Sequence, residues 1–180
     1  KLWQFSAAYP AAGAVAEETP AVPALMDLDD DGSRDTLVFG DLAGRLWALA
    51  LADGRPYGDA PVFVVPNGLA EPIGAGVAIL GRLAVFGTGG VETADSHYQY
   101  ALYAVELLPD RCRLRWFYRL EAGEKVWQTP TFDDARNLLF GTAVDYLSLA
   151  QAAELSSSGR IVALNPSGDE VASREMAAAS

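Results

Sequence analysis

Four aspartates with a regular spacing stand near the start of this 180-residue sequence, just before an apolar segment. Asp27, Asp29 and Asp31 alternate in the stretch LMDLDDDGSRD, and Asp35 follows eight residues after Asp27. Carboxylates held a few ångströms apart repel one another unless a cation lies between them. Alternating carboxylates on a loop are typical of sites that bind a hard divalent cation through oxygen. The stretch therefore predicts either a metal loop or a loosely solvated acidic turn.

The spacing matches the first, third, fifth and ninth ligand positions of an EF-hand loop, with Gly32 at the bend and the Ser33 carbonyl at the seventh position. The twelfth position holds Val38 where an EF-hand needs a bidentate glutamate, and a strand follows instead of a helix. Because several charged oxygen ligands favour Ca²⁺ over Mg²⁺ or Zn²⁺, we expect a calcium loop between two strands. In the solvated alternative, Asp30 and Arg34 face outward and no ion binds. The predicted ligands are Asp27, Asp29, Asp31, Ser33 and Asp35.

Three Phe-Gly steps indicate an internal repeat in the chain. Each step follows a proline-marked segment and precedes an apolar strand with an Ala-Leu or Ala-Val core. The steps are TLVFGD (36–41), LAVFGTGG (83–90) and NLLFGTA (137–143). The intervals between the phenylalanines are about fifty residues, the length of one four-stranded propeller blade. The pattern predicts an all-β fold that is a partial β-propeller, with about three four-stranded blades of a larger ring; a β-sandwich is the alternative.

The repeat divides the chain into blade-like units at about 1–57, 58–110 and 111–168, with 169–180 as the start of a further strand or a tail. Each unit is predicted to open with a β-rich strand: KLWQF, PVFVV and RLRWFYRL. With these strands counted first, the aspartate loop joins the second and third strands of its unit. Three blades do not close a ring, so we expect one propeller domain whose other blades lie outside this segment. A helix is expected only in SLAQAAEL (148–155).

Charge and composition exclude two classes of partner. The net charge is −11 and there is no run of basic residues like those that bind phosphate backbones, so nucleic acid is not expected as a partner. No stretch approaches the roughly 18 consecutive apolar residues that a membrane span requires. The single cysteine, Cys112, allows no disulfide within the segment.

The residues around the aspartate loop resemble a known family. MDLDDDGSRDTLVFGDLAGRLWAL is similar to the signature of PilY1-type type IV pilus biogenesis proteins, whose C-terminal region is a calcium-binding β-propeller. VFGTGGVETAD (85–95) is similar to a second hallmark of that family, and WQTPTF with LLFGTA and GRIVALNPSG is similar to the wider quinoprotein-like repeat. Ala48 departs from the basic residue that many members carry there. The positions in step with the first hallmark are Asp27, Asp29, Asp31, Asp35, Gly40, Asp41, Gly44 and Trp47.

The resemblance implies a bacterial protein that is secreted or exposed at the cell surface and associated with the pilus. It implies a calcium-binding propeller without catalytic activity that supports pilus assembly, opposes retraction and can act as a tip adhesin. The expected partners are pilus subunits (minor pilins) or a host or surface ligand, besides the other blades of the same propeller. The family's propeller is more than twice as long as this segment.

Three other functions stay open. A non-catalytic scaffold of an envelope complex needs a propeller but no calcium. A quinoprotein dehydrogenase uses the same repeat, but it often grips its quinone with a vicinal disulfide, which Cys112 alone cannot form. An integrin-like propeller carries an acidic loop in most blades, whereas only the first unit has one here. His97, with Glu92 and Asp95 nearby, offers either a second metal site or an acid/base pair, but a polar hairpin loop explains these residues better.

Overall fold

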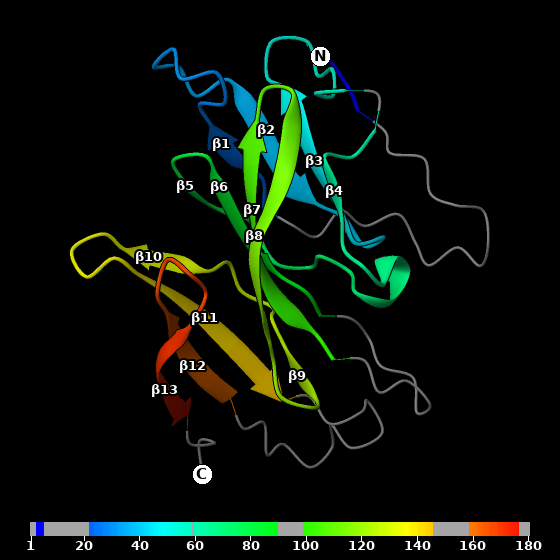
Figure 1. The fold of residues 1–180 in the computed structure, drawn as a ribbon. Coiled ribbons are helices and arrows are strands. Elements are labelled where there is room, and N and C mark those ends of the chain that lie inside the picture. Colours follow the sequence, from blue (N-terminus) through cyan, green and yellow to red (C-terminus); the bar gives the residue numbers. More distant parts are fainter. Residues whose placement is uncertain (1–2, 6–21, 59, 90–98, 146–158, 177–180) are drawn as a thin grey trace.

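The strands of this protein form three antiparallel sheets that follow one another along the chain (Figure 1). A computed structural model describes residues 3–5, 22–58, 60–89, 99–145 and 159–176. Among these residues the one helical element is the 3-10 turn η1, Gly68–Ala70, so the predicted all-β class is confirmed. The described residues contain no helical segment with the length and hydropathy that a bilayer crossing requires.

Each sheet is built from strands that are consecutive in sequence, in the order in which they pair. The first sheet contains β1 (Ala24–Met26), β2 (Thr36–Gly40), β3 (Arg45–Ala50) and β4 (Phe63–Val64). The second contains β5 (Ala78–Leu80), β6 (Leu83–Gly87), β7 (Ala101–Leu108) and β8 (Arg111–Arg119). The third contains β10 (Thr131–Asp133), β11 (Leu138–Asp145), β12 (Gly159–Leu164) and β13 (Glu170–Met176), and β9 (Glu124–Lys125) pairs with the end of β11.

The sheets are offset from the predicted units by one strand. PVFVV was expected to open the unit 58–110, but its strand β4 is the last strand of the first sheet. RLRWFYRL was expected to open the unit 111–168, but its strand β8 is the last strand of the second sheet. The sequence pattern predicts where each strand lies but not which sheet it joins, because a strand at the boundary between two repeats has the same apolar pattern in either sheet.

Apolar side chains fill both junctions between neighbouring sheets. One core lies between the first and second sheets and includes Leu46 and Phe86, and the other lies between the second and third sheets and includes Leu102 and Val162. The connection between the first two sheets lies close against β2: a Cβ on Gly40 would overlap the side chain of Ile73. The glycine of the Phe-Gly step is therefore needed where the chain leading into the next sheet crosses β2.

In the third Phe-Gly step, the phenylalanine and the glycine have exchanged faces of the strand relative to the other two steps. Phe39 is buried in a cluster with residues 3–5. Phe86 is buried in the core between the first two sheets. In β11, by contrast, a Cβ on Gly141 would meet Leu102 of the second sheet. Since neighbouring residues of a strand face opposite sides, Phe140 faces away from the second sheet and is half-buried. A shift of one residue in strand position is enough to exchange the two faces.

Several predicted features lie outside the described residues. They are the helix expected at 148–155, most of the second hallmark, and His97 with Glu92 and Asp95.

Candidate metal site

The aspartate loop connects β1 to β2 at one end of the first sheet. Asp27 follows Met26 at the end of β1, and Asp35 precedes Thr36 at the start of β2. The loop therefore joins the first and second strands of its sheet, where the sequence predicted the second and third. This difference has the same cause as the offset of the units: residues 3–5 were expected to be the first strand, but they are not a strand of this sheet.

The carboxylate of Asp27 organises the turn. Its Oδ1 accepts hydrogen bonds from the backbone N–H groups of Asp30 (2.8 Å) and Asp31 (3.2 Å), and its Oδ2 accepts one from Gly32 (2.9 Å). To present these N–H groups, Asp30 and Gly32 adopt left-handed backbone angles, with φ of 68° and 91°. Glycine adopts such a φ without steric cost and aspartate tolerates it better than most residues, so the sequence suits the turn.

Three of the predicted ligands come together in this turn. One carboxylate oxygen from each of Asp27, Asp29 and Asp31 lies within 4.8 Å of the others. Asp35 does not join that group, and its Oδ1 instead accepts a hydrogen bond from the Thr36 hydroxyl at 3.4 Å. The Ser33 carbonyl accepts the N–H of Asp35 at 3.2 Å.

The donor set fits a calcium ion. All three ligand atoms are carboxylate oxygens, which hard cations prefer, and Asp29 and Asp31 are exposed to solvent that can complete the coordination. Two oxygens on opposite sides of a calcium ion are about 4.8 Å apart, because each Ca–O distance is about 2.4 Å. The three oxygens can therefore contact one ion without a large rearrangement of the turn.

The loop is attached to the junction between the first two sheets. Leu28, between two of the ligands, is 2% exposed and belongs to the core that these sheets share. On the outer side, Asp30 forms an exposed ion pair with Arg82 of the β5–β6 turn, with 3.8 Å between the guanidinium nitrogen and Oδ2. The turn therefore contacts both sheets, through an apolar anchor and through a weak surface pair.

The Gly-Asp and Trp positions of the first hallmark have a structural role. Asp41, fully buried after β2, accepts backbone hydrogen bonds from Ala43 (2.9 Å) and Arg45 (3.1 Å) on Oδ1. Its Oδ2 accepts hydrogen bonds from Nε of Arg45 (2.7 Å) and Nε1 of Trp47 (2.8 Å). Asp41 thus closes the β2–β3 turn and orients Trp47, and it is not a ligand of the aspartate loop.

A second buried carboxylate was not identified from the sequence. Glu71 lies in the connection between the first and second sheets and is fully buried. Its Oε2 accepts a hydrogen bond from the Tyr103 hydroxyl (2.7 Å), and its Oε1 accepts one from Nδ2 of Asn67 (2.9 Å). Burial, together with the hydrogen bond to Glu71, raises the pKa of Tyr103 well above its usual value, so the phenol stays a neutral donor. Each carboxylate oxygen of Glu71 therefore has a hydrogen-bond partner, and the side chain links the connection between the two sheets to β7.

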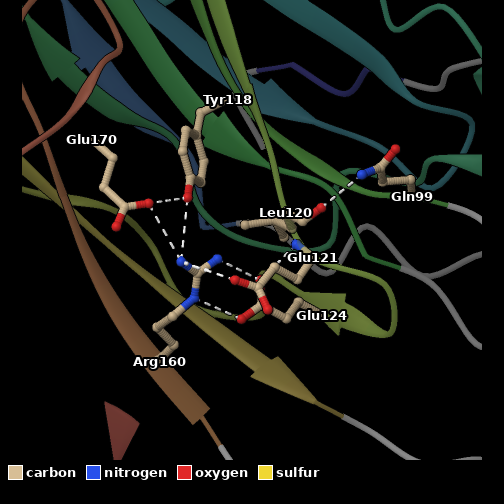
Figure 2. A network of polar contacts seen from close by, with 7 residues as sticks. All are labelled: Gln99, Tyr118, Leu120, Glu121, Glu124, Arg160 and Glu170. Atoms are coloured by element: carbon tan, nitrogen blue, oxygen red, sulfur yellow. Dashed lines mark hydrogen bonds and ion pairs between the residues drawn. The ribbon is translucent and has the colours of Figure 1, made fainter. Parts of the chain in front are cut away.

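A charged network joins the second sheet to the third (Figure 2). Arg160 on β12 donates two parallel hydrogen bonds to Glu124, from Nε to Oε1 (2.9 Å) and from Nη2 to Oε2 (2.8 Å). Its Nη1 lies 3.3 Å from the Tyr118 hydroxyl, 3.4 Å from Glu170 and 3.6 Å from Glu121. Tyr118 in turn donates a hydrogen bond to Glu170. Three glutamates thus surround one guanidinium, which is 11% exposed.

The network sets the titration of its members. Burial is the largest influence and would raise the pKa of Glu124, but the hydrogen bonds from Arg160, the backbone N–H of Glu121 and the charge of Arg160 together hold that pKa below its usual value. The hydrogen bond from Tyr118 lowers the pKa of Glu170. Burial and the hydrogen bond to Glu170 raise the pKa of the Tyr118 phenol. At neutral pH Glu124 and Glu170 are therefore ionised and Tyr118 is a neutral donor.

Cys112, Trp3 and Trp116 each donate a hydrogen bond to a backbone carbonyl, whereas Trp127 is 46% exposed. Cys112 is half-buried, its thiol donates to the Val62 carbonyl at 2.6 Å, and burial raises its pKa, so it is a poor nucleophile. Trp3 donates from Nε1 to the Leu51 carbonyl (2.8 Å). Trp116 donates from Nε1 to the Pro166 carbonyl of the third sheet (3.0 Å).

Comparison with known proteins supports the fold but no close family. No protein-family model and no curated protein sequence matches the chain. Among solved structures it is similar to the quinohemoprotein alcohol dehydrogenases ADHIIG from Pseudomonas putida HK5 (TM-score 0.60, 17% identity) and from Comamonas testosteroni (TM-score 0.60, 16% identity), each over 81% of this chain. It is also similar to BamB from Moraxella catarrhalis, with a TM-score of 0.58 and 16% identity over 98% of this chain.

These similarities confirm a partial β-propeller built from quinoprotein-like repeats. The chain spans 26% of the length of each dehydrogenase and 43% of BamB. At these levels of sequence identity the likeness concerns the fold alone.

Proposed function

We propose that this chain is a calcium-binding part of a propeller that acts by binding other molecules and not by catalysis. The observation that carries the proposal is the meeting of Asp27, Asp29 and Asp31 in one turn, with one oxygen from each within 4.8 Å of the others. Such a group of carboxylates is electrostatically unfavourable without a cation and suits calcium by its oxygen donors.

Calcium would act by fixing the turn between β1 and β2. Bound calcium offsets two of the three negative charges, and Leu28, which lies between Asp27 and Asp29 in sequence, extends that constraint into the core shared by two sheets. The loop and its neighbouring β5–β6 turn would then present one defined surface at this end of the propeller. Because only the folded loop gathers the ligands, calcium would also stabilise the folded state by linkage.

The biological setting that we propose is a PilY1-type type IV pilus biogenesis protein or tip adhesin. Support comes from the sequence resemblance of the loop and of the Gly-Asp turn that follows it, in which Asp41 and Trp47 are joined by a buried hydrogen bond of 2.8 Å. The partners would be minor pilins or a host or surface ligand, and the protein would be secreted and pilus-associated.

A second candidate is a non-catalytic envelope scaffold that needs no metal. The observation in its favour is that the second junction is complete without the acidic loop: its core and the Arg160 network involve none of the loop aspartates. Here the propeller would only hold other proteins in place.

Titration calorimetry separates the two candidates. We expect the wild-type chain to bind Ca²⁺ more tightly than Mg²⁺, because the loop offers several carboxylates without an octahedral cage. Asp31→Ala removes one ligand and should weaken calcium binding at least about tenfold, as expected for loss of a charged ligand. Asp30→Asn is the control: it removes the same charge one residue away, from a carboxylate outside the group of three, and asparagine tolerates the left-handed φ of this position.

Two results would refute the calcium proposal. One is equal affinity for Ca²⁺ and Mg²⁺, and the other is an Asp31→Ala variant that binds calcium as tightly as Asp30→Asn does. If calcium also leaves the melting temperature unchanged, the scaffold is the better account.

A further inference from the structure

Strand β8 is a long edge strand. It spans nine residues, Arg111–Arg119, and is the outermost strand of the second sheet. Among the described residues it pairs with one strand, β7. The corresponding outer strand of the first sheet, β4, has two residues. A long edge strand presents unpaired backbone N–H and C=O groups, which another extended chain can meet.

This edge is basic although the protein is acidic. Four of its nine residues are arginines, in a chain with 13 lysines and arginines and a net charge of −11. Arg115 is an extra residue at a bulge and forms an ion pair with Glu106 at 3.6 Å. Arg111, Arg113 and Arg119 are exposed, and within the described part of the chain none of the three forms an ion pair. The edge therefore attracts negative charge in a protein that otherwise repels it.

Two large apolar side chains are exposed between the arginines. Leu114 is 38% exposed and Phe117 is 46% exposed. The Phe117 ring is held from one side by Tyr103, with 6.0 Å between ring centroids, and the Arg119 guanidinium lies 5.2 Å from its centroid. An exposed aromatic ring with an arginine beside it has the aromatic and arginine composition that is enriched at protein interfaces.

We propose that the β8 edge binds an extended acidic segment of another protein as an added strand. Backbone pairing along β8 would supply the alignment, the apolar surface of Leu114 and Phe117 would receive alternate side chains, and the free arginines would pair with carboxylates. A second copy of this chain is not the partner, because pairing two β8 edges would place arginines near arginines. The inference does not depend on calcium, since none of these residues contacts the aspartate loop.

The test uses a fluorescein-labelled seven-residue peptide in which glutamate alternates with valine, followed by fluorescence anisotropy. We expect saturable binding that weakens as salt is raised, because the contacting charges are exposed. The same peptide with lysine in place of glutamate should bind at least about tenfold more weakly, from the loss of two or three ion pairs and their reversal into repulsion. Amide hydrogen exchange along residues 111–119 should slow when the acidic peptide binds.

Two further probes separate strand addition from simple attraction between charges. An acidic peptide N-methylated at alternate residues keeps its charge but cannot pair along one edge, so it should lose binding. The protein variant Arg113→Glu with Arg119→Glu should lose affinity for the acidic peptide about tenfold. Arg34→Glu with Arg174→Glu makes the same change of net charge at two exposed arginines away from β8 and should keep the wild-type affinity.

Several outcomes would overturn the proposal. They are no saturable binding of the acidic peptide, equal binding of the acidic and lysine peptides, and equal binding of the N-methylated peptide. Dimerisation of the chain that Arg113→Glu with Arg119→Glu abolishes would also overturn it, since the edge would then serve a second copy.

Discussion

The junction between the first and second sheets and the junction between the second and third are closed by different interactions. The first is an apolar core with aromatic rings at its centre: Phe86 and Tyr103 stack with centroids 5.6 Å apart, and Phe63 packs against both. Its buried polar group, Glu71, is satisfied by neutral donors. The junction therefore depends mainly on shape and burial.

The second junction combines an apolar core, which includes the buried Tyr100, with a charged network. Leu102, Val162 and Leu164 fill the interior, and Arg160 with its glutamates lies beside them. A bidentate arginine–carboxylate pair fixes geometry, but each partner depends on the other because a buried charge left alone is costly. The comparison shows that one repeat can be joined to the next in two ways, and the second adds an arginine–glutamate network to the apolar core.

The largest expected effect is in the aromatic core. Phe86→Ala, at a side chain with 0% exposure, should lower the free energy of unfolding by about 3–5 kcal/mol, the usual range for removing a buried phenylalanine. The matched control is Phe140→Ala, since Phe140 occupies the same step of the repeat but faces away from the second sheet. It should cost about 1 kcal/mol. Urea unfolding measures both, and equal losses would contradict the reversed orientation of β11.

The next effect concerns the charged network. Arg160→Met leaves Glu124 nearly buried without its partner and should cost about 3 kcal/mol, as in other buried pairs that lose one member. Arg160→Met with Glu124→Leu removes the stranded charge and should recover most of the loss. Hydrogen exchange should show faster opening of the third sheet and little change in the first. If the double variant is no more stable than the single one, the pair does not hold this junction.

The smallest effect is the response to acid. The pKa of Glu124 is lowered on folding from its usual 4.5, so its contribution to stability is present above pH 4.5 and is lost as the pH falls through the lower folded pKa. Glu170 acts in the same direction. Wild-type stability should therefore fall below pH 4.5 more steeply than that of Arg160→Met with Glu124→Leu. Chemical unfolding at pH 7, 4.5 and 3.5 tests this, and parallel curves would contradict it.

The strands were predictable because their pattern is local. The Phe-Gly steps placed β2, β6 and β11, and the alternation of apolar residues placed β3 and β7. The assignment of strands to sheets was not predictable in the same way. Whether β4 and β8 are the last strand of one sheet or the first strand of the next depends on pairing between strands that are distant in sequence. The orientation of Phe140 depends on a shift of one residue along β11.

The candidate site was predictable in part for the same reason. Asp27, Asp29 and Asp31 are near one another in sequence, so their spacing was enough to predict that their carboxylates meet. The proposed ligand roles of these three residues, and of Ser33 and Asp35, remain predictions. The pairs Tyr103–Glu71 and Arg160–Glu124 are separated by 32 and 36 residues, and no short motif marks them. These two pairs could be identified only from the folded structure, in which residues distant in sequence come into contact.

The most direct test of the calcium proposal is a crystal structure of the chain grown with calcium, with anomalous scattering recorded. The account predicts an anomalous peak in the β1–β2 turn, with oxygens of Asp27, Asp29 and Asp31 at about 2.4 Å from it. An ordered turn without such a peak, with the three carboxylates directed apart into solvent, would contradict it.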